Sequence, residues 1–493
     1  MTEHMYDMEA MESLKSKNGA RTEDLGRGLR AIIVCSHNDR TQTPPATRST
    51  LTVLTNASAK DPMSATIARV RRREIIQQIG TARIHHSSML EQFILESQPD
   101  ATAFAALTRP ALHRRSRWIG IHPTYRLEKE LAADFFSLLG KMVDIWTKEP
   151  RRNNNKINNL IDTHRTLLPD DRHPGHTLRP DLFVQGTSSL FPPHHIGDKL
   201  EWSSCVAIGD VKLHQGRRKM DTFGQLGTYA EQVFSAQENR RFIPTFYFDN
   251  SHIVWCIFDR GGAVHGDAVN YQRDPRKLCA LVLHFLFNGT DLGMDTSIRY
   301  EDGLTLISTT PPSEVSSSTS EETLPKIPRA TFVVQRTLFH STDIQGSGTI
   351  YWFVQRHDPR SEYEGNWCII KDTWVVNGCK PEREIYERIH SSLTQAMGQD
   401  DLREGIIPSG QGVAPLLFTH DVLFAGRLDS VSINRPPGVN TLPEDNRVHT
   451  RAVFRATAGV KLLDQFSSAM ELLVAVRDAV QGTLLSCHLS VHS

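Results

Sequence analysis

The sequence predicts an α+β protein with more than one domain, and three observations lead to this prediction. The chain has 493 residues, which is more than one hydrophobic core usually organises. Helical and strand-like patterns alternate between residues 66 and 305. A stretch rich in Ser, Thr and Pro then separates this part of the chain from a second region with strand-like patterns.

The N-terminal part divides into a polar segment and a helical one. Residues 1–65 are polar and show no sustained period, so we expect them to be disordered. Residues 66–98 have a helical pattern and carry a short basic cluster, Arg69 and Arg71–Arg73. Because runs of charge on a helix mostly face water, we expect this cluster to form a solvated helix face.

The region up to residue 305 is predicted to form an α/β domain. Apolar residues recur at helical spacing over Arg126–Trp146. Short apolar runs that follow predict four strands, with a helix at Gln225–Arg240 between the second and the third, and the strands are Asp181–Gln185, Cys205–Leu213, Phe242–Phe248 and His252–Phe258. The residues Asp249–Ser251 have the composition of a tight turn between the last two strands.

The clearest domain boundary lies between residues 306 and 328. In the segment 308–328, Ser, Thr and Pro fill 14 of 21 positions, which is typical of an extended, flexible linker. A second domain is therefore expected over residues 329–493.

Composition excludes several classes of protein. Lys and Arg number 56, as do Asp and Glu, so the net charge of zero does not support nucleic acid as a partner, although a local basic patch is compatible with it. The seven cysteines are scattered and form no C-x-x-C pair, which favours a reducing compartment. No secretory signal and no apolar run long enough for a membrane helix are evident. We expect an intracellular protein, cytoplasmic or nuclear, that does not bind a membrane.

A set of acidic and basic residues in the first domain indicates metal chemistry. Asp181 follows a proline, and Asp210 and Lys212 lie two residues apart, so their side chains share one face of a strand. The pattern P-D…D-x-K resembles that of the PD-(D/E)XK nuclease fold. The resemblance implies that Asp181 and Asp210 hold Mg²⁺ and that Lys212 orients the attacking water, with Gln225 on the following helix. The structural alternative is a salt-bridged Asp–Lys pair on an edge strand.

A second set of residues follows the linker. Gly346-Ser347-Gly348-Thr349 lies between two apolar runs, and Lys371 occurs 23 residues after Gly348 at the end of an apolar strand. A helix that begins near Glu382 follows, with Glu384 and Glu387 as alternatives to Glu382. A kinase needs a glycine loop over the ATP phosphates, a lysine on the third strand and a glutamate that pairs with it. Taken singly, each feature more often has an ordinary explanation: a turn, a strand-end lysine on an edge strand and an exposed glutamate on a helix. The three features in this order are less easily accidental.

The ordered set resembles the fungal-type protein kinase family. The resemblance covers roughly residues 170–490 and rests on the following matches: RPDLFVQG, VAIGDVKL, EQVFSAQENRRF, FDRGG, the GSGT hairpin, IIKDTW, Arg451, Gly459, Phe466, Glu471-Leu472 and Asp478-Ala479-Val480. It implies ATP-dependent phosphoryl transfer to protein Ser or Thr, with ATP bound at Gly346, Gly348, Lys371 and Glu382 and with Mg²⁺ as the metal. The fold class is then a PD-(D/E)XK-like α/β domain followed by a kinase-like N-lobe with a partial C-lobe.

The sequence departs from the family at its C-terminal end. After Val480 it reads QGTLLSCHLSVHS, and it contains neither an His-Arg-Asp nor an Asp-Phe-Gly motif. Those motifs position the substrate hydroxyl and the metal, on which phosphoryl transfer depends. We therefore expect a catalytically inactive, truncated kinase-like protein. The alternatives are a pseudokinase or interaction scaffold with unknown protein partners, and a metal-dependent nuclease. The earlier Asp-Arg-Gly of Phe258–Gly262 is expected to be a strand end and turn.

Overall fold

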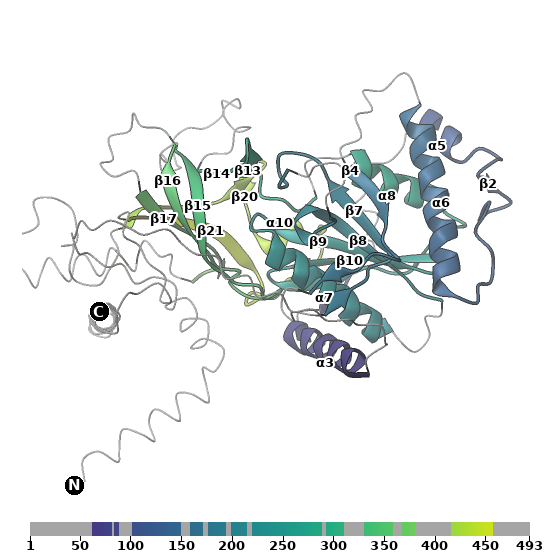
Figure 1. Cartoon of the computed structure of the whole chain (residues 1–493), viewed down its shortest axis with the longest axis horizontal. Coiled ribbons are helices and arrows are strands. Elements are labelled where there is room, and N and C mark those ends of the chain that lie inside the picture. Colours follow the sequence, from purple (N-terminus) through teal and green to yellow (C-terminus); the bar gives the residue numbers. More distant parts are fainter. Residues whose placement is uncertain are drawn as a thin grey trace, which may run out of the picture. The chain divides into compact units, whose positions relative to one another are not determined.

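The structure is a computed structural model of the whole chain (Figure 1). It describes residues 62–80, 83–87, 101–148, 158–170, 176–193, 199–213, 219–287, 292–309, 330–357, 367–379, 384, 386 and 416–456. Most of the predicted disordered segment and of the predicted linker therefore lies outside the described residues, as does Glu382.

The chain divides into two compact units. One comprises Arg71–Pro381 and Phe418–Val453 and contains nearly all of the described strands. The other comprises Met1–Val70, Glu382–Leu417 and Phe454–Ser493, of which few residues are described. A domain boundary at the Ser/Thr/Pro segment stays a prediction.

The first large sheet has eight strands in the order β1-β11-β10-β9-β8-β7-β4, with β12 beside β10. The strands are β1 (Arg83–His85), β4 (Asn158–Asp162), β7 (Leu182–Gly186), β8 (Cys205–Val211), β9 (Phe242–Phe248), β10 (His252–Asp259), β11 (Gly262–His265) and β12 (Val269–Asn270). β8 and β9 are parallel and are connected through helix α7 (Lys219–Ala236), whereas β4, β7 and β8 pair antiparallel in turn.

Helices cover both faces of this sheet (Figure 1). Helices α6 (Glu128–Thr147) and α8 (Pro275–Phe287) pack on one face, and α5 (Ala101–Leu107) lies beside them. Helix α7 packs on the other face together with α3 (Pro62–Ile79). Each helix has one apolar face, so burying these faces against the sheet removes most of the large apolar side chains from water.

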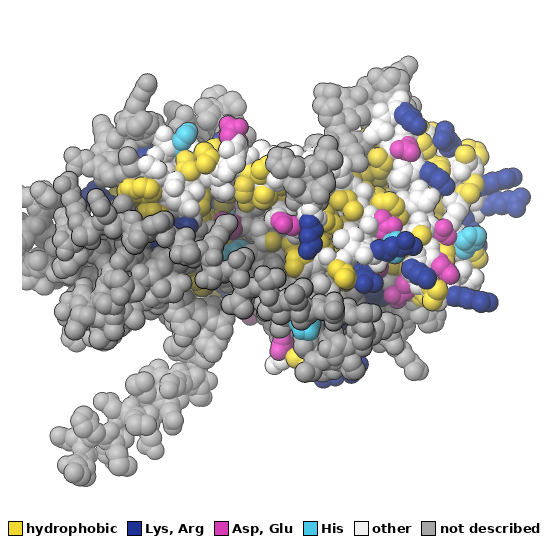
Figure 2. Space-filling model, viewed as in Figure 1, with side chains coloured by type: hydrophobic (Ala, Val, Ile, Leu, Met, Phe, Trp, Pro, Cys, Tyr) yellow, Lys and Arg dark blue, Asp and Glu magenta, His cyan; other side chains and the backbone are white. Residues whose placement is uncertain are grey.

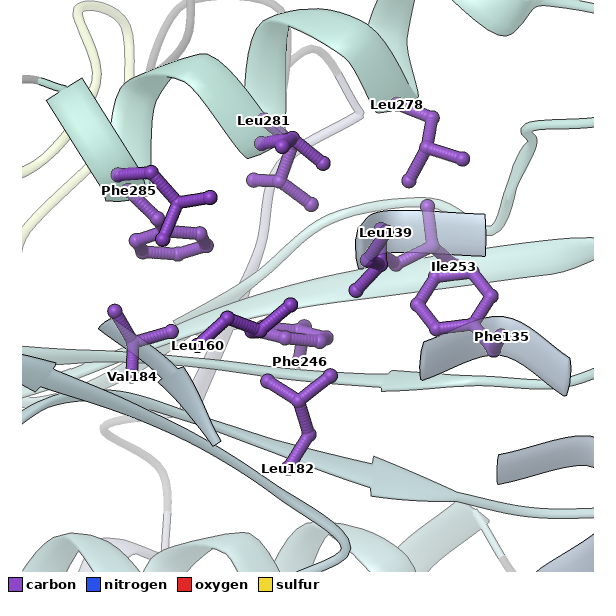
Figure 3. Close-up of a pocket in the computed structure, with 12 residues that line it drawn as sticks. Phe135, Leu139, Leu160, Leu182, Val184, Phe246, Ile253, Leu278, Leu281 and Phe285 are labelled. Atoms are coloured by element: carbon purple, nitrogen blue, oxygen red, sulfur yellow. The ribbon is translucent and has the colours of Figure 1, made fainter. Parts of the chain in front are cut away.

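The apolar layer under α6 and α8 contains a small void. Figure 3 shows side chains from both helices and from β4, β7, β9 and β10 pointing toward one another around it. Its volume is about 20 Å³ and every residue that lines it is hydrophobic. Because an apolar space of this size has no partners for water, it is a packing defect of the core and not a ligand site.

The second large sheet has seven strands in the order β13-β14-β15-β16-β17-β21-β18. They are β13 (Ile298–Glu301), β14 (Leu304–Ser308), β15 (Thr331–His340), β16 (Ile350–Arg356), β17 (Trp367–Val376), β18 (Leu416–Asp421) and β21 (Arg447–Arg455). β15, β16 and β17 form consecutive antiparallel pairs, and the hairpin 341–349 joins the first two.

The remaining described elements are short. Two-stranded pairs are β2 (His113–Arg114) with β3 (Arg117–Trp118), β5 (Leu168–Pro169) with β6 (Thr177–Leu178), and β19 (Leu423–Phe424) with β20 (Arg427–Leu428). The 3₁₀ turn η3 (Trp202–Ser204) precedes β8, and the helix α10 (Val431–Asn434) follows β20. No helix among the described residues is long and apolar enough to cross a lipid bilayer.

The length of one helix was predicted wrongly from the sequence. The pattern over residues 66–98 predicts a single helix, but α3 ends at Ile79. Gly80 follows with a φ of 44°, a left-handed conformation that glycine supplies at helix ends. The chain then enters β1, which pairs parallel with β11, so strand pairing outweighs the helical pattern there.

The basic cluster on α3 is also only partly solvated. Arg69 and Arg73 are exposed, but Arg71 is 4% exposed. Its guanidinium lies 2.5 Å from the Asp170 carboxylate and 2.7 Å from that of Glu231. The expectation of a solvated face is therefore wrong for Arg71, because two distant acidic residues converge on it and make its burial tolerable.

Candidate functional site

Asp181 and Asp210 lie side by side at one end of the first sheet. Asp181 immediately precedes β7, and Asp210 is the penultimate residue of β8. The register pairs Leu182 with Gly209, which brings the two aspartates together. The Oδ2 atom of Asp181 accepts a hydrogen bond of 2.8 Å from the backbone N–H of Val211.

Lys212 completes this cluster. Its Nζ atom lies 2.5 Å from Oδ2 of Asp210, whose side chain is only 2% exposed. The structural alternative placed a salt-bridged Asp–Lys pair on an edge strand. The salt bridge is present, but β8 lies between β7 and β9 and is therefore not an edge strand. Burial opposes the charge of Lys212, but the carboxylates of Asp210, Glu128 and Asp181 outweigh burial and raise its pKa. Lys212 is therefore a cation at neutral pH.

The proton affinity of Asp181 is strongly changed. Burial raises the pKa of Asp181 to about 8, and the charge of Asp210 and a hydrogen bond with it add to the rise. Asp210 is buried and Asp181 is half-buried. Two adjacent carboxylates that are shielded from water repel each other when both are ionised, so one of them retains a proton more readily. This arrangement is typical of carboxylates that bind a cation, because a metal ion removes the same repulsion.

Gln225 reaches the cluster only through another residue. It lies in the second turn of α7, and its Nε2 atom donates a 2.6 Å hydrogen bond to the Tyr229 hydroxyl. That hydroxyl donates in turn to the carbonyl of Arg179, at 3.0 Å. Burial and the charges of Asp210 and Asp181 raise the pKa of Tyr229 well above its usual range. Tyr229 was missed in the sequence, although its position four residues after Gln225 places both on one helix face.

The donor set fits a hard divalent cation. Asp181 and Asp210 offer carboxylate oxygens, and Mg²⁺ is commonly held by one or two carboxylates with water in its other positions. Glu128, at the start of α6, is exposed but acts on the charge of Lys212 and thus lies near the cluster. Two other acidic residues of α6 are placed differently: Glu130 is exposed, and Asp134 accepts a hydrogen bond of 2.9 Å from Tyr125.

The glycine hairpin of the second sheet is held by the turn after β10. Gly346 and Gly348 have φ values of 145° and 50°, which few other residues adopt. The Gly346 amide donates to the Arg260 carbonyl at 3.0 Å, and the Ser347 carbonyl accepts from Trp374 N–H at 2.7 Å. A Cβ atom on residue 348 would overlap the guanidinium of Arg260. Residues 260 and 261 form the turn expected for Phe258–Gly262.

Lys371 lies within a central strand and is half-buried. It is opposite Tyr351 of β16, and its Nζ atom lies 5.9 Å from the centre of the Tyr351 ring. Because Glu382 and Glu387 fall outside the described residues, the predicted lysine–glutamate pair stays a prediction. Glu384 is helical and exposed.

A buried network of charges beside Lys371 was not anticipated. His449 lies between Asp372 and Asp429. Its Nε2 atom is 2.9 Å from the Asp372 carboxylate, and its Nδ1 atom is 2.9 Å from the Asp429 carboxylate. Asp429 also pairs with Arg241 at 2.7 Å. Although burial alone would lower the pKa of His449, the two carboxylates raise it to about 9.

The same network contains an arginine that excludes a metal ion. Oxygen and nitrogen atoms of Asp295, Asp372 and His449 lie within 4.8 Å of one another. However, the Nη2 atom of Arg451 lies 2.9 Å from Asp295 and 3.1 Å from Asp372, in the place that a cation would take. His449 and Arg451 lie two residues apart on β21 and so share one face of the strand, and this spacing was the one sequence signal for the network.

These features define a kinase-like α+β protein. A glycine hairpin joins the first two of three antiparallel strands, and a lysine lies on the third, as in the nucleotide-binding lobe of kinases. The model of one protein family, fungal protein kinase, matches residues 179–488, which is more than half of the chain. The chain therefore belongs to the fungal protein kinase family. No curated protein matches the sequence.

Proposed function

We propose that this member of the fungal protein kinase family acts as a kinase-like interaction scaffold with weak nucleotide binding, and not as an efficient phosphotransferase. The observation that carries the proposal is the docking of the glycine hairpin on Arg260. A kinase uses the backbone of this hairpin to cover the ATP phosphates, so the hairpin must be open toward the nucleotide.

Several contacts hold the glycine hairpin against the rest of the protein. The Gly346 amide donates a hydrogen bond to the Arg260 carbonyl, and the Nη1 atom of Arg260 donates to the carbonyl of Asp343 at 2.5 Å. Ile344 is fully buried in the apolar cluster that covers α7. The Gln345 side chain donates to Asp445 at 2.9 Å. Opening the hairpin would expose Ile344 to water and break these bonds together, which opposes nucleotide binding.

Incubation of the purified full chain with Mg-ATP tests this proposal. We expect no phosphoryl transfer above that of Lys371→Ala. We also expect Mg-ATP to stabilise the folded protein by less than the ~2.7 kcal/mol that a ligand at a hundredfold excess over its Kd supplies, which is measured as a small rise in melting temperature. Lys199→Ala, which removes an exposed lysine, is the matched control. Robust autophosphorylation that disappears in Lys371→Ala but not in Lys199→Ala would overturn the scaffold proposal. It would assign the activity to the second large sheet, here called the kinase-like sheet, which contains Lys371.

A second candidate function is favoured by the Asp181–Asp210–Lys212 cluster. We infer that this cluster supports metal-dependent hydrolysis of phosphodiesters. Asp181 and Asp210 would hold Mg²⁺ or Mn²⁺, and the bound metal would lower the pKa of a water and neutralise charge on the phosphate. Lys212, a cation fixed 2.5 Å from Asp210, is placed to orient that water and to stabilise developing negative charge.

The hydrolase candidate is tested with labelled DNA and RNA in Mg²⁺ or Mn²⁺. The wild type is compared with Asp210→Ala plus Lys212→Ala and with a control, Glu444→Gln, which changes an exposed acidic residue. We expect cleavage by the wild type and by the control only. Equal activity in all three preparations would assign any cleavage to a contaminant and remove this candidate.

A further inference from the structure

An open polar pocket lies on the first sheet near the cluster described above. Its volume is about 270 Å³. Three parts of the chain surround it: the β2–β3 hairpin with the segment after it, the turn between β9 and β10, and the residues that follow β12. Its polar lining includes Arg117, His122, Asn250, Ser251, Gln272 and Arg273.

Backbone contacts connect this pocket to the Asp181–Asp210–Lys212 cluster. The Lys212 amide donates to the carbonyl of Phe248, the last residue of β9, at 2.9 Å. Asn250, in the pocket wall, follows two residues later, and two residues of chain span at most about 7 Å. The wall residue Pro123 accepts a hydrogen bond from Asn250 and leads into α6, whose first residue acts on the charge of Lys212. The pocket and the cluster therefore lie at the same end of β8 and β9.

The hairpin at the pocket carries an unusual concentration of positive charge. Arg114 and Arg117 are directly opposite each other in the β2–β3 pair, where like charges are destabilising. The two residues between them, Arg115 and Ser116, have φ values of 52° and 55°. Left-handed conformations at consecutive residues other than glycine store local strain. An anion held against these arginines would offset the repulsion.

No nearby acidic group neutralises the pocket arginines in the part of the chain that the structure describes. Arg117 and Arg273 are exposed, and neither guanidinium has a carboxylate partner there. The closest acidic residues along the chain have other partners: Asp249 accepts hydrogen bonds from the Ser251 and His252 amides, and Asp274 pairs with Lys277. Figure 2 shows several Lys and Arg side chains, with Asp and Glu side chains among them, on the side where Figure 1 places β2 and α6.

We propose that this basic pocket binds the phosphate backbone of a nucleic acid and presents it to the Asp181–Asp210–Lys212 cluster. The proposal rests on the hydrolase candidate above, for which it names the substrate class. Arginine guanidinium groups form paired hydrogen bonds with phosphate oxygens. A backbone with regularly spaced phosphates engages the pocket and the metal-binding end of the sheet together, whereas a single phosphate fills only one of them. The neutral net charge of the chain is compatible with this local site.

Fluorescence anisotropy with labelled single-stranded and duplex DNA and with RNA, in EDTA, tests binding separately from cleavage. We expect Arg117→Ala plus Arg273→Ala to weaken binding about tenfold at 50 mM salt, and the slope of log Kd against log salt to fall by about 2. The control Lys199→Ala plus Arg427→Ala removes the same charge from exposed positions elsewhere and is expected to bind like the wild type. Thermal melting of all three proteins confirms that the substitutions leave them folded.

The outcomes separate this inference from the hydrolase candidate. If the pocket variant loses binding while no protein cleaves, the pocket stands and the hydrolase fails. If the pocket variant and the control lose binding equally, the attraction is a property of total charge and the inference is wrong. It is also wrong if inorganic phosphate displaces the oligonucleotide at equal phosphate concentration, since the pocket then recognises a free anion and not a backbone.

Discussion

The guanidinium of Arg260 occupies the space that a Cβ atom on Gly348 would need. Arg260 is 2% exposed and lies over the Phe234 ring, with its Cζ atom 4.2 Å from the ring centre. This contact joins the turn after β10 to the glycine hairpin of the kinase-like sheet. The glycine is thus required here by a neighbouring side chain of the protein itself, and not only by an approaching nucleotide.

The first prediction follows from this contact. Gly348→Ala adds a Cβ atom that overlaps Arg260. We expect it to lower the free energy of unfolding by about 1–3 kcal/mol more than Gly→Ala at a position with a similar φ and free space around the Cβ atom. Gly80→Ala is the matched control, because Gly80 has a φ of 44° against 50° for Gly348 but nothing within 4 Å of its Cβ position. Urea unfolding of both variants measures the difference, and equal losses would show that Arg260 moves away without cost.

A second prediction concerns the buried ion pair of Arg435 with Asp259. The two side chains form a bidentate pair with distances of 2.7 and 2.8 Å, and they are 1% and 0% exposed. Arg435→Ala leaves an uncompensated buried carboxylate, so we expect a loss of about 3–5 kcal/mol in unfolding free energy.

The partly exposed pair of Arg299 with Glu301 serves as the control for Arg435. Its atoms are 3.2 Å apart, and its side chains are 30% and 44% exposed. Arg299→Ala is expected to change stability by less than about 1 kcal/mol. Similar losses for Arg299→Ala and Arg435→Ala in urea unfolding would contradict the interpretation of Arg435 and Asp259 as a buried cross-link.

A third prediction is a loss of stability at alkaline pH through His449. The pKa of this residue is raised to about 9 in the folded protein, against about 6.5 for an ordinary histidine. Its stabilisation is therefore complete below pH 6.5 and is lost as the pH rises through about 9. Between these values the unfolding free energy should fall by about 3 kcal/mol in the wild type.

His449→Gln should make that pH dependence markedly flatter and lower stability at pH 6. The control is His85→Gln, because the side chain of His85 is 51% exposed. Urea unfolding at pH 6, 7.5 and 9 supplies the comparison. A wild-type stability that does not fall over this range, or falls equally in His449→Gln, would rule out a protonated His449 between Asp372 and Asp429.

A fourth prediction links divalent cations to the protonation of Asp181. Its pKa is raised to about 8, so a metal ion must displace a proton below that pH. Mn²⁺ at millimolar concentration is expected to raise the melting temperature more at pH 8 than at pH 6. Asp181→Asn should abolish this effect, whereas Glu444→Gln should retain it. A cation effect that is independent of pH, or that persists in Asp181→Asn, would place the binding site elsewhere.

Local sequence patterns predicted much of the fold and part of the candidate site. The strand over Phe242–Phe248 is as expected, and the next strand and the turn between them differ by at most one residue. Asp210 and Lys212 share one side because residues two apart in a strand do so in any fold. Such predictions succeed because they depend only on neighbours along the chain.

Residues far apart in the chain decided what the sequence alone left open. The burial of Arg71 depends on Asp170 and Glu231, which lie 99 and 160 residues away. No periodicity in the sequence predicts such a pairing, because a charged residue on a helix gives the same local pattern whether its side chain is solvated or paired with a distant carboxylate.

The sequence by itself determined the family, the glycine hairpin and the acidic pair beside Lys212. Only the tertiary structure decided that the hairpin docks on Arg260 and that a basic pocket lies at the same end of the sheet as Asp181 and Asp210. The reason is physical: a motif fixes which groups are available, whereas packing between distant segments fixes which of them are engaged and which remain open to a ligand.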